Sequence, residues 1–202
     1  MLIRDLTIAG AAVIEPQVFS DPRGAFLEWF RADTAAEALG RRVGIVQANL
    51  SVSARGVVRG VHYADVPPGQ AKWVSVPRGR IIDYVVDLRV GSPTFGATEA
   101  VELDSESRRA VFLAEGLGHA FVALEHDTLV SYLVTDVFRP DKEHGISPAD
   151  PELGLDFPVP AGELILSAKD TAAPTLAEAI AAGALPTWEA CQTRYAELAV
   201  RV

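Results

Sequence analysis

The sequence VVRGVHYADVPPGQAKWVSVPRGRIIDYVVDL, residues 57–88, contains the strongest structural signal in the chain. It holds three runs of branched, aromatic and other apolar residues, at 57–62, 72–76 and 80–88, separated by Pro and Gly. Short runs of this composition between turn residues are typical of β-strands. The sequence therefore predicts three consecutive strands.

The same pattern extends to both sides, whereas helical patterns lie only at the edges. Further strands are expected at 25–30, 45–53, 97–103, 110–113, 120–124 and 129–136. Capping-box patterns predict a helix opening at Thr34 and another at Thr175, and residues 188–200 predict a terminal helix. Many short strands with few peripheral helices indicate an all-β sandwich, jelly roll or barrel. We expect one domain over residues 1–202, with a helical extension at its C-terminal end.

Composition excludes several classes of protein. The chain of 202 residues is 49% hydrophobic and 22% charged, which is typical of a globular domain and excludes intrinsic disorder and a disulfide scaffold. A formal net charge of -9 argues against binding to nucleic acid or to an anionic membrane. The sole cysteine, Cys191, fits a reducing compartment. With neither a signal peptide nor an apolar segment of spanning length in the sequence, we expect a cytoplasmic location.

Two short motifs carry the first chemical signal. GVVRGVH at 56–62 resembles the first signature of the cupins, and AEGLGH at 114–119 resembles the second. Only His62 and His119 remain of the usual metal ligands, and Lys72 is expected near them. A fixed ammonium and two imidazoles do not suit a transition metal, so we expect neither a metal nor another cofactor. A histidine and a lysine in one pocket indicate proton transfer next to a carbonyl group.

A longer series of motifs resembles the dTDP-4-dehydrorhamnose 3,5-epimerase family. The motifs occur in the family's order between about residues 19 and 174, and they are FSDPRGAFLE (19–28), QANLS (47–51), RGVHY (59–63), QAK (70–72), GHAF (118–121), Tyr132, EHGI (143–146), DPEL (150–153) and LSAKD (166–170). The resemblance implies a cupin-type jelly roll. It also implies an enzyme that inverts C3, C5 or both in a dTDP-linked 4-keto-6-deoxyhexose, through an enolate.

The resemblance assigns roles to four residues. His62 resembles the base, and Asp170 its partner, which fixes the tautomer and stabilises the imidazolium. Lys72 is expected to face the developing enolate oxygen. Tyr132 resembles the proton donor on the opposite face of the sugar.

The resemblance also implies a set of substrate contacts and a homodimer. The expected contacts are Arg23, Phe26, Glu28, Gln47, Asn49, Arg59, His119, Phe138, Glu143 and Lys169. Phe138 stands where many relatives have a tyrosine stacked on thymine, so the aromatic face is kept and the hydroxyl is lost. Because the N-terminal strands of the family cross to a partner subunit, the first three contacts are expected to complete a neighbouring pocket.

Other interpretations stay open from the sequence. The enzyme could invert a single carbon or act as a 3,4-ketoisomerase. A metal-dependent cupin using His62 and His119, and a non-catalytic nucleotide-sugar-binding module, are alternatives from other classes. His62 and Tyr132 could also be ordinary core residues. The pairs Arg41–Arg42 and Arg108–Arg109 are expected on solvated faces, and His126 and His144 receive no role.

Overall fold

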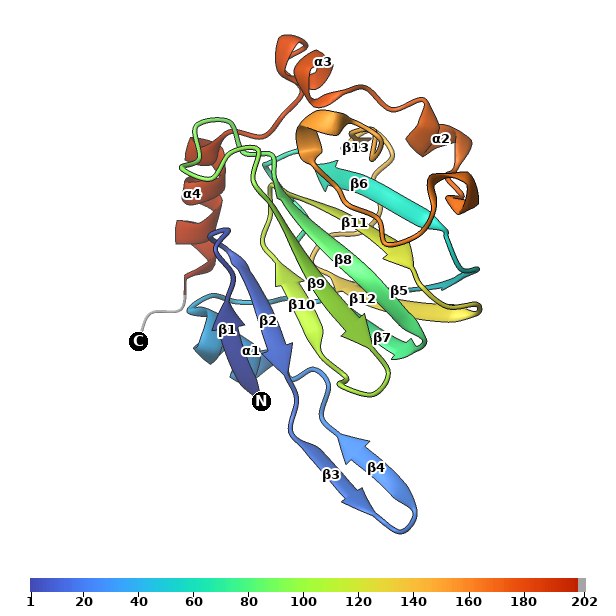
Figure 1. The fold of residues 1–202 in the computed structure, drawn as a ribbon. Coiled ribbons are helices and arrows are strands. Elements are labelled where there is room, and N and C mark those ends of the chain that lie inside the picture. The colour runs from blue at the N-terminus through green and yellow to red at the C-terminus, as the bar shows by residue number, and fades with distance from the viewer. Residues whose placement is uncertain (200–202) are drawn as a thin grey trace.

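The computed structural model describes residues 1–199, which fold into two large antiparallel sheets and a separate hairpin (Figure 1). The six-stranded sheet has the order β1 (Leu2–Asp5), β2 (Ala11–Glu15), β10 (Ala110–Leu113), β7 (Lys72–Arg78), β12 (Thr128–Val134), β5 (Gln47–Ser53). The five-stranded sheet has the order β13 (Glu143–Gly145), β6 (Val58–Ala64), β11 (Leu117–Ala123), β8 (Arg80–Asp87), β9 (Thr98–Asp104). From β5 to β8 and again from β9 to β13, successive strands alternate between the two sheets. This path is that of a jelly roll, so the predicted fold class is confirmed.

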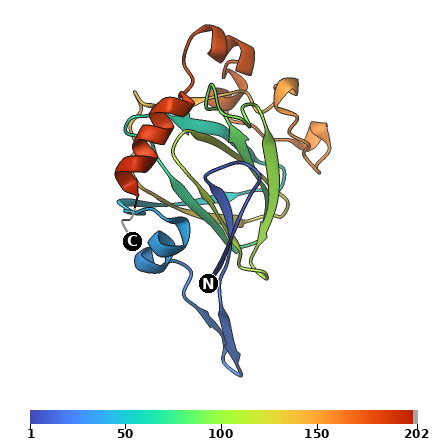
Figure 2. The ribbon, with the colours of Figure 1, turned by 90° about the vertical axis from the view of Figure 1, so that its left-hand side faces the viewer.

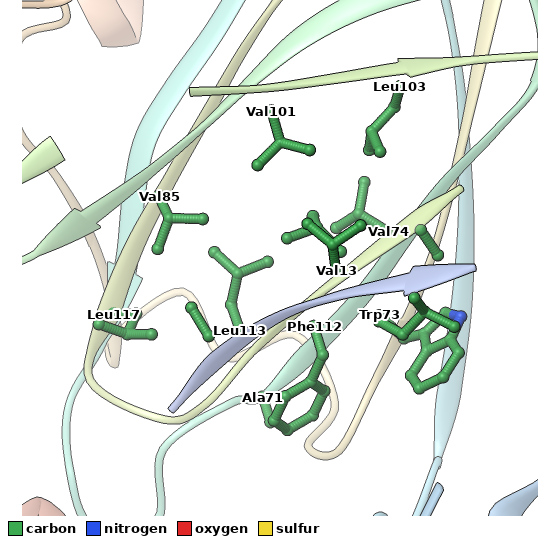
Figure 3. Close-up of a cluster of buried hydrophobic side chains, with 14 of the residues drawn as sticks. Val13, Ala71, Trp73, Val74, Val85, Val101, Leu103, Phe112, Leu113 and Leu117 are labelled. Carbon is green, nitrogen blue, oxygen red and sulfur yellow. The ribbon is translucent and has the colours of Figure 1, made fainter. Parts of the chain in front are cut away.

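The main core lies between the two sheets. Val13 and Val74 of the six-stranded sheet pack with Val85, Val101 and Leu103 of the five-stranded sheet (Figure 3). All are β-branched or otherwise apolar residues at alternating strand positions, as expected for the inner faces of a sandwich. Their burial holds the sheets together and sets the distance across which polar side chains can meet.

Other elements cover the outer faces. Trp73, which points away from the inter-sheet core, packs edge-on against Phe30 at 5.2 Å, beside helix α1 (Ala32–Leu39). A second cluster lies against the five-stranded sheet, where Tyr84 and Val86 meet Leu153 and Leu176. The elements of this covering segment are η1 (Pro151–Leu153), η2 (Ala161–Glu163), α2 (Ala168–Thr171) and α3 (Leu176–Ala181).

None of the helices within residues 1–199 is long and apolar enough to cross a membrane.

The hairpin of β3 (Val18–Asp21) and β4 (Gly24–Leu27) projects away from the body of the molecule, as the two ribbon views agree (Figures 1 and 2). It pairs with neither large sheet. Its side chains Phe19 and Phe26 are exposed, the latter to 71%. An isolated two-stranded hairpin with exposed aromatic rings is marginally stable in water, so this element indicates an interface.

The helix predictions were partly correct. The capping box at Thr175 is present, since Thr175 Oγ1 accepts from the Glu178 amide and the Glu178 carboxylate accepts from the Thr175 amide. The box at Thr34 was wrong. Helix α1 begins three residues earlier, with Arg31 and not Thr34 at the N-cap; the Arg31 guanidinium binds Asp33, and Asp33 also accepts from the Thr34 amide. The N-cap residue Arg31 makes no side-chain capping bond.

The ends of some elements also differ from expectation. Strand β4 ends at Leu27, not at residue 30, and β11 begins at Leu117, so His119 lies within a strand and does not follow a turn. Helix α4 spans Trp188–Leu198, and the predicted end at Val200 lies outside the described residues.

Arg41 was wrongly expected on a solvated face. It is buried, and its guanidinium binds Glu115 at 2.5 Å between the rings of Phe112 and Tyr195. Because the charge is paired and stacked on aromatic faces, its burial is compensated.

Candidate active site

A cavity of about 450 Å³ is lined by side chains from both sheets and from the loops beside them. The lining residues are Gln47, Asn49, Arg59, His62, Gln70, Lys72, His119, Phe121, Tyr132, Phe138, Glu143, His144 and Lys169. A volume of this size is typical of a small-molecule site. The cavity therefore brings together most of the residues that the sequence predicted, from segments far apart in the chain.

Strand register places four of these residues on the inner face of the six-stranded sheet. Val134 of β12 is paired with Lys72 on one side and with Gln47 on the other. Tyr132, two residues earlier, is paired with Asn49. Residues directly opposite one another, and residues two apart, share a face of a sheet. Lys72 and Tyr132 therefore point into the same cavity.

The five-stranded sheet presents its residues through a bulge in β6. His62 is paired with His119, whereas Arg59 is paired with Phe121, so the spacing is three residues on β6 and two on β11. In a regular strand, residues three apart such as Arg59 and His62 would point to opposite faces, and the bulge turns them to the same face. At the bulge, Gly60 has a φ of 123°, and a Cβ there would lie 2.5 Å from the Cβ of Ala120. Only glycine fits this position.

We expect Gly60→Ala to destabilise the protein by about 3 kcal/mol, because an added methyl group meets both a forbidden φ and a closed space. Urea unfolding of the variant measures this loss. Gly162→Ala is the matched control, since nothing lies within 4 Å of a Cβ there, and it should change the free energy of unfolding by less than about 1 kcal/mol. Equal stability of the two variants would contradict the argument from the bulge.

His62 is joined to Asp170, 108 residues away in sequence. Its Nε2 lies 2.7 Å from Oδ1 of Asp170, which is only 5% exposed. The other oxygen, Oδ2, accepts from the hydroxyl of Ser167 at 2.8 Å, and Ser167 caps α2. Burial raises the pKa of Asp170, but the contacts with His62 and Ser167 outweigh it, and the pKa lies below the ordinary value. An ionised carboxylate thus fixes the imidazole and can stabilise its protonated form.

A second imidazole–carboxylate pair lies on the neighbouring strands. His119 Nε2 is 2.6 Å from Oδ2 of Asp83, which is fully buried on β8. The other oxygen of Asp83 has no hydrogen-bond partner within residues 1–199. Sequence reasoning did not assign Asp83 to the site, although a carboxylate interrupting an apolar strand was a usable signal.

Lys72 is a partly buried lysine whose ammonium no carboxylate neutralises directly. Burial lowers its pKa, and the charges of Glu143 and Asp83 oppose that shift. Within the described chain, no carboxylate oxygen lies within 4.0 Å of its Nζ, in contrast to the ion pairs elsewhere in the molecule. Its charge is therefore available to a ligand in the cavity.

Tyr132 lies on the inner face of the six-stranded sheet, whereas His62 lies on the five-stranded sheet across the cavity. No hydrogen bond of its hydroxyl to another group is present among residues 1–199. Burial raises its pKa, Arg59 lowers it, and Glu143 raises it further, with a net upward shift. The phenol is thus protonated at neutral pH. Of the alternatives from the sequence, a core tyrosine with a satisfied hydroxyl does not describe this side chain.

Three predicted contacts lie outside this cavity. Arg23 is bonded to Asp21 in the projecting hairpin, and Phe26 is exposed beside it. Glu28 lies 3.8 Å from Arg31. One chain alone therefore does not bring these three residues to the site.

The histidines are not arranged as a metal site. Within residues 1–199, no three side chains of His, Cys, Asp or Glu lie together as metal ligands would. His62 and His119 each hold a carboxylate on Nε2. His144, which was given no role, also lines the cavity, and its Nε2 lies 2.7 Å from Asp65.

A jelly roll with two histidines of adjacent strands directed into the space between its sheets defines the protein as a cupin. Residues 5–178 match the family model described as dTDP-4-dehydrorhamnose 3,5-epimerase. The chain belongs to this family.

Individual relatives are similar over nearly the whole chain. A dTDP-4-dehydrorhamnose 3-epimerase from Streptomyces niveus is 53% identical, over 95% of this chain and 92% of its own. A dTDP-4-dehydrorhamnose 3,5-epimerase from Mycolicibacterium smegmatis is also 53% identical, over 95% and 94%. The structure of a 3'-monoepimerase from Streptomyces bikiniensis in complex with dTDP-quinovose is 44% identical, with a TM-score of 0.92 and coverage of 96% and 97%.

Proposed function

We propose that this protein is an isomerase that epimerises a dTDP-linked 4-keto-6-deoxyhexose at C3, C5 or both. The observation that carries the proposal is the joint placement of His62, Lys72 and Tyr132 on one cavity, with His62 paired to Asp170. The names of the relatives support the substrate class. Since one inversion and two are represented at the same identity of 53%, overall similarity does not separate them.

The proposed reaction is proton transfer at carbon next to a ketone. The C4 carbonyl acidifies the hydrogen on the neighbouring carbon, and His62 removes this proton while the electron pair moves to the C4 oxygen. Lys72 stabilises the resulting enolate by its positive charge. Tyr132 then delivers a proton to the opposite face of the same carbon, and the carbonyl re-forms with inverted configuration. Asp170 stabilises the imidazolium that holds the abstracted proton.

The rim of the cavity supports binding of a nucleoside diphosphate in spite of the net charge of -9. Arg59 and Lys169 line it, and both suit phosphate oxygens. Phe138 is 56% exposed at this rim, and its amide donates to Gln47, which orients the ring-bearing loop. We assign Phe138 to stacking on the base. Asn49 and Glu143 supply further polar contacts.

We propose a homodimer in which the hairpin of each protomer reaches the cavity of the other. The outer face of the edge strand β5 exposes Leu50 and Val52, the former to 62%. Leu50 lines an apolar groove of about 500 Å³ together with Trp29. An apolar edge strand of this kind is normally covered. This arrangement would deliver Arg23, Phe26 and Glu28 to a site, and sedimentation equilibrium tests it, since a monomer at working concentration would exclude it.

The unpaired thiol of Cys191 supports a cytoplasmic location.

The function is tested by incubating the protein with dTDP-4-keto-6-deoxyglucose in deuterated buffer and following the sugar by NMR. Inverted product with deuterium at C3, at C5 or at both identifies an epimerase and counts its inversions. Movement of the carbonyl to C3 would identify a ketoisomerase. Unchanged substrate with binding retained would leave only a binding module.

In the same assay, we expect Tyr132→Phe to reduce inversion about 100-fold while exchange falls less than about tenfold, because the base is untouched and only the opposite proton donor is lost. Retained exchange without inversion is the diagnostic result. An equal loss of exchange and inversion would remove Tyr132 from the donor role.

A further inference from the structure

The ammonium of Lys72 shares its cavity with a carboxylate that does not pair with it. Glu143 and Lys72 line the same cavity. The negative charge of Glu143 raises the pKa of Lys72 more than that of Asp83 does. Opposite charges in a site of low dielectric attract strongly, and an ion pair would occupy the ammonium. No such pair forms within 4.0 Å among residues 1–199. The Glu143 carboxylate is instead hydrogen-bonded to other groups.

Gln70 provides one of these hydrogen bonds. Its Nε2 donates to Oε1 of Glu143 at 3.2 Å and to the carbonyl oxygen of Asp136 at 3.1 Å. The second bond fixes the side-chain amide of Gln70, because the backbone at Asp136 is itself held in place. Asp136 lies just beyond the end of β12, and the neighbouring Thr135 N–H donates to the carbonyl oxygen of Ala71 at 3.2 Å. Gln70 precedes Lys72 by two residues on that segment. One short stretch thus carries both the ammonium and the group that restrains its potential partner.

We propose that Gln70 is a positioning residue that restrains the Glu143 carboxylate from pairing with Lys72, so that the ammonium remains free for the carbonyl oxygen of the substrate. The inference rests on the proposed function for the identity of that oxygen. Glutamine suits the role because it donates a neutral hydrogen bond and brings no charge of its own. Oε1 of Glu143 also accepts from the Arg139 amide at 3.4 Å, whereas Oε2 accepts from no group in the described chain, which leaves it for a sugar hydroxyl.

Crystal structures of the unliganded wild type and of Gln70→Ala test the restraint without reference to catalysis. In the variant, the Glu143 carboxylate is expected to move to within ion-pair distance of Lys72 Nζ. If it keeps its wild-type position, the inference is overturned. If it moves although the wild type turns over no nucleotide sugar, the proposed function fails and the positioning role stands.

Kinetics with the active wild type provide the second test, as a double-mutant cycle. Gln70→Ala is expected to lower kcat about tenfold with a smaller change in KM, because the free charge is needed most as the enolate forms. In a Glu143→Gln background, the same substitution should change kcat less than about twofold, since no carboxylate is left to pair with Lys72. A full effect in that background would mean that Gln70 acts on the ligand directly or on folding, and would overturn the inference. Gln192→Ala, on the exposed face of α4, is the matched control and should leave kcat unchanged.

Discussion

Replacement of His62 by alanine is expected to abolish incorporation of solvent deuterium at C3 and C5, with a fall in kcat of about 1,000-fold or more. General-base catalysis by a positioned imidazole contributes effects of about this size. His62 is the base best placed for it, because its Nε2 is fixed at 2.7 Å from a carboxylate whose pKa is lowered. The measurement is the rate at which the C–H signals of the substrate disappear in deuterated buffer.

Two further variants make this result specific. His126→Ala removes an exposed loop histidine and should retain the wild-type rate. Asp170→Asn keeps the shape of the side chain but removes the charge that stabilises the imidazolium. Its rate of deuterium exchange should therefore lie between those of His62→Ala and the wild type. Exchange that continues at the wild-type rate in His62→Ala would transfer the role of base to another group.

The dependence of the Asp170 contribution on pH has a defined sign. Its pKa is lowered in the folded protein, so the ionised Asp170 carboxylate and its contacts stabilise the fold above the ordinary pKa of aspartate. This contribution is lost as the pH falls through the lowered value. As the pH falls through that range, the wild type is expected to lose activity and free energy of unfolding together. In Asp170→Asn, the free energy of unfolding should no longer fall from this cause.

The sequence predicted the strands of the inter-sheet core well because apolar alternation is a local property. Residues 72–76 lie within β7, and the expected strand 80–88 differs from β8 only in its last residue. Strands β1 and β2 were missed, because β2 is placed by its pairing with β10, about 100 residues away, and β1 by its pairing with β2, more than by their own composition. The early start of α1 was missed for another reason, since the helix begins after Arg31, whose side chain makes no capping bond and so leaves no capping signal in the sequence.

The site residues that belong to sequence motifs could be predicted, whereas those whose role depends on contacts between strands could not. His62, Lys72 and Tyr132 were found through the resemblance, and the structure brings them to one cavity. Asp83 was not found, because its role follows from a cross-strand contact with His119 and not from its neighbours in sequence. The bulge that turns Arg59 and His62 to the same face requires the pairing register, which no local pattern encodes.

Lys72→Met should lower kcat about 1,000-fold while leaving the protein at least as stable as the wild type. The loss of activity follows from removing the charge that faces the enolate oxygen, an effect comparable to the loss of an oxyanion-hole donor. Stability should not fall, because burial lowers the pKa of Lys72, which means that the folded state disfavours its charged form. Methionine fills a similar volume without that charge. Lys142→Met, at a lysine paired with Asp65 outside the proposed chemistry, is the control and should keep kcat within about twofold.

The pH profile of the wild type should identify the same lysine. Lys72 is active when protonated, so kcat/KM should decline as the pH rises through its lowered pKa, below the range of an ordinary lysine. Tyr132 must also be protonated, but its pKa is raised, so it titrates later and does not set this limb. The acidic groups that oppose the shift of Lys72 are Glu143 and Asp83, and Glu143→Gln should therefore move the basic limb to lower pH. A limb that stays in place in Glu143→Gln, or that is identical in Lys72→Met, would show that another group controls it.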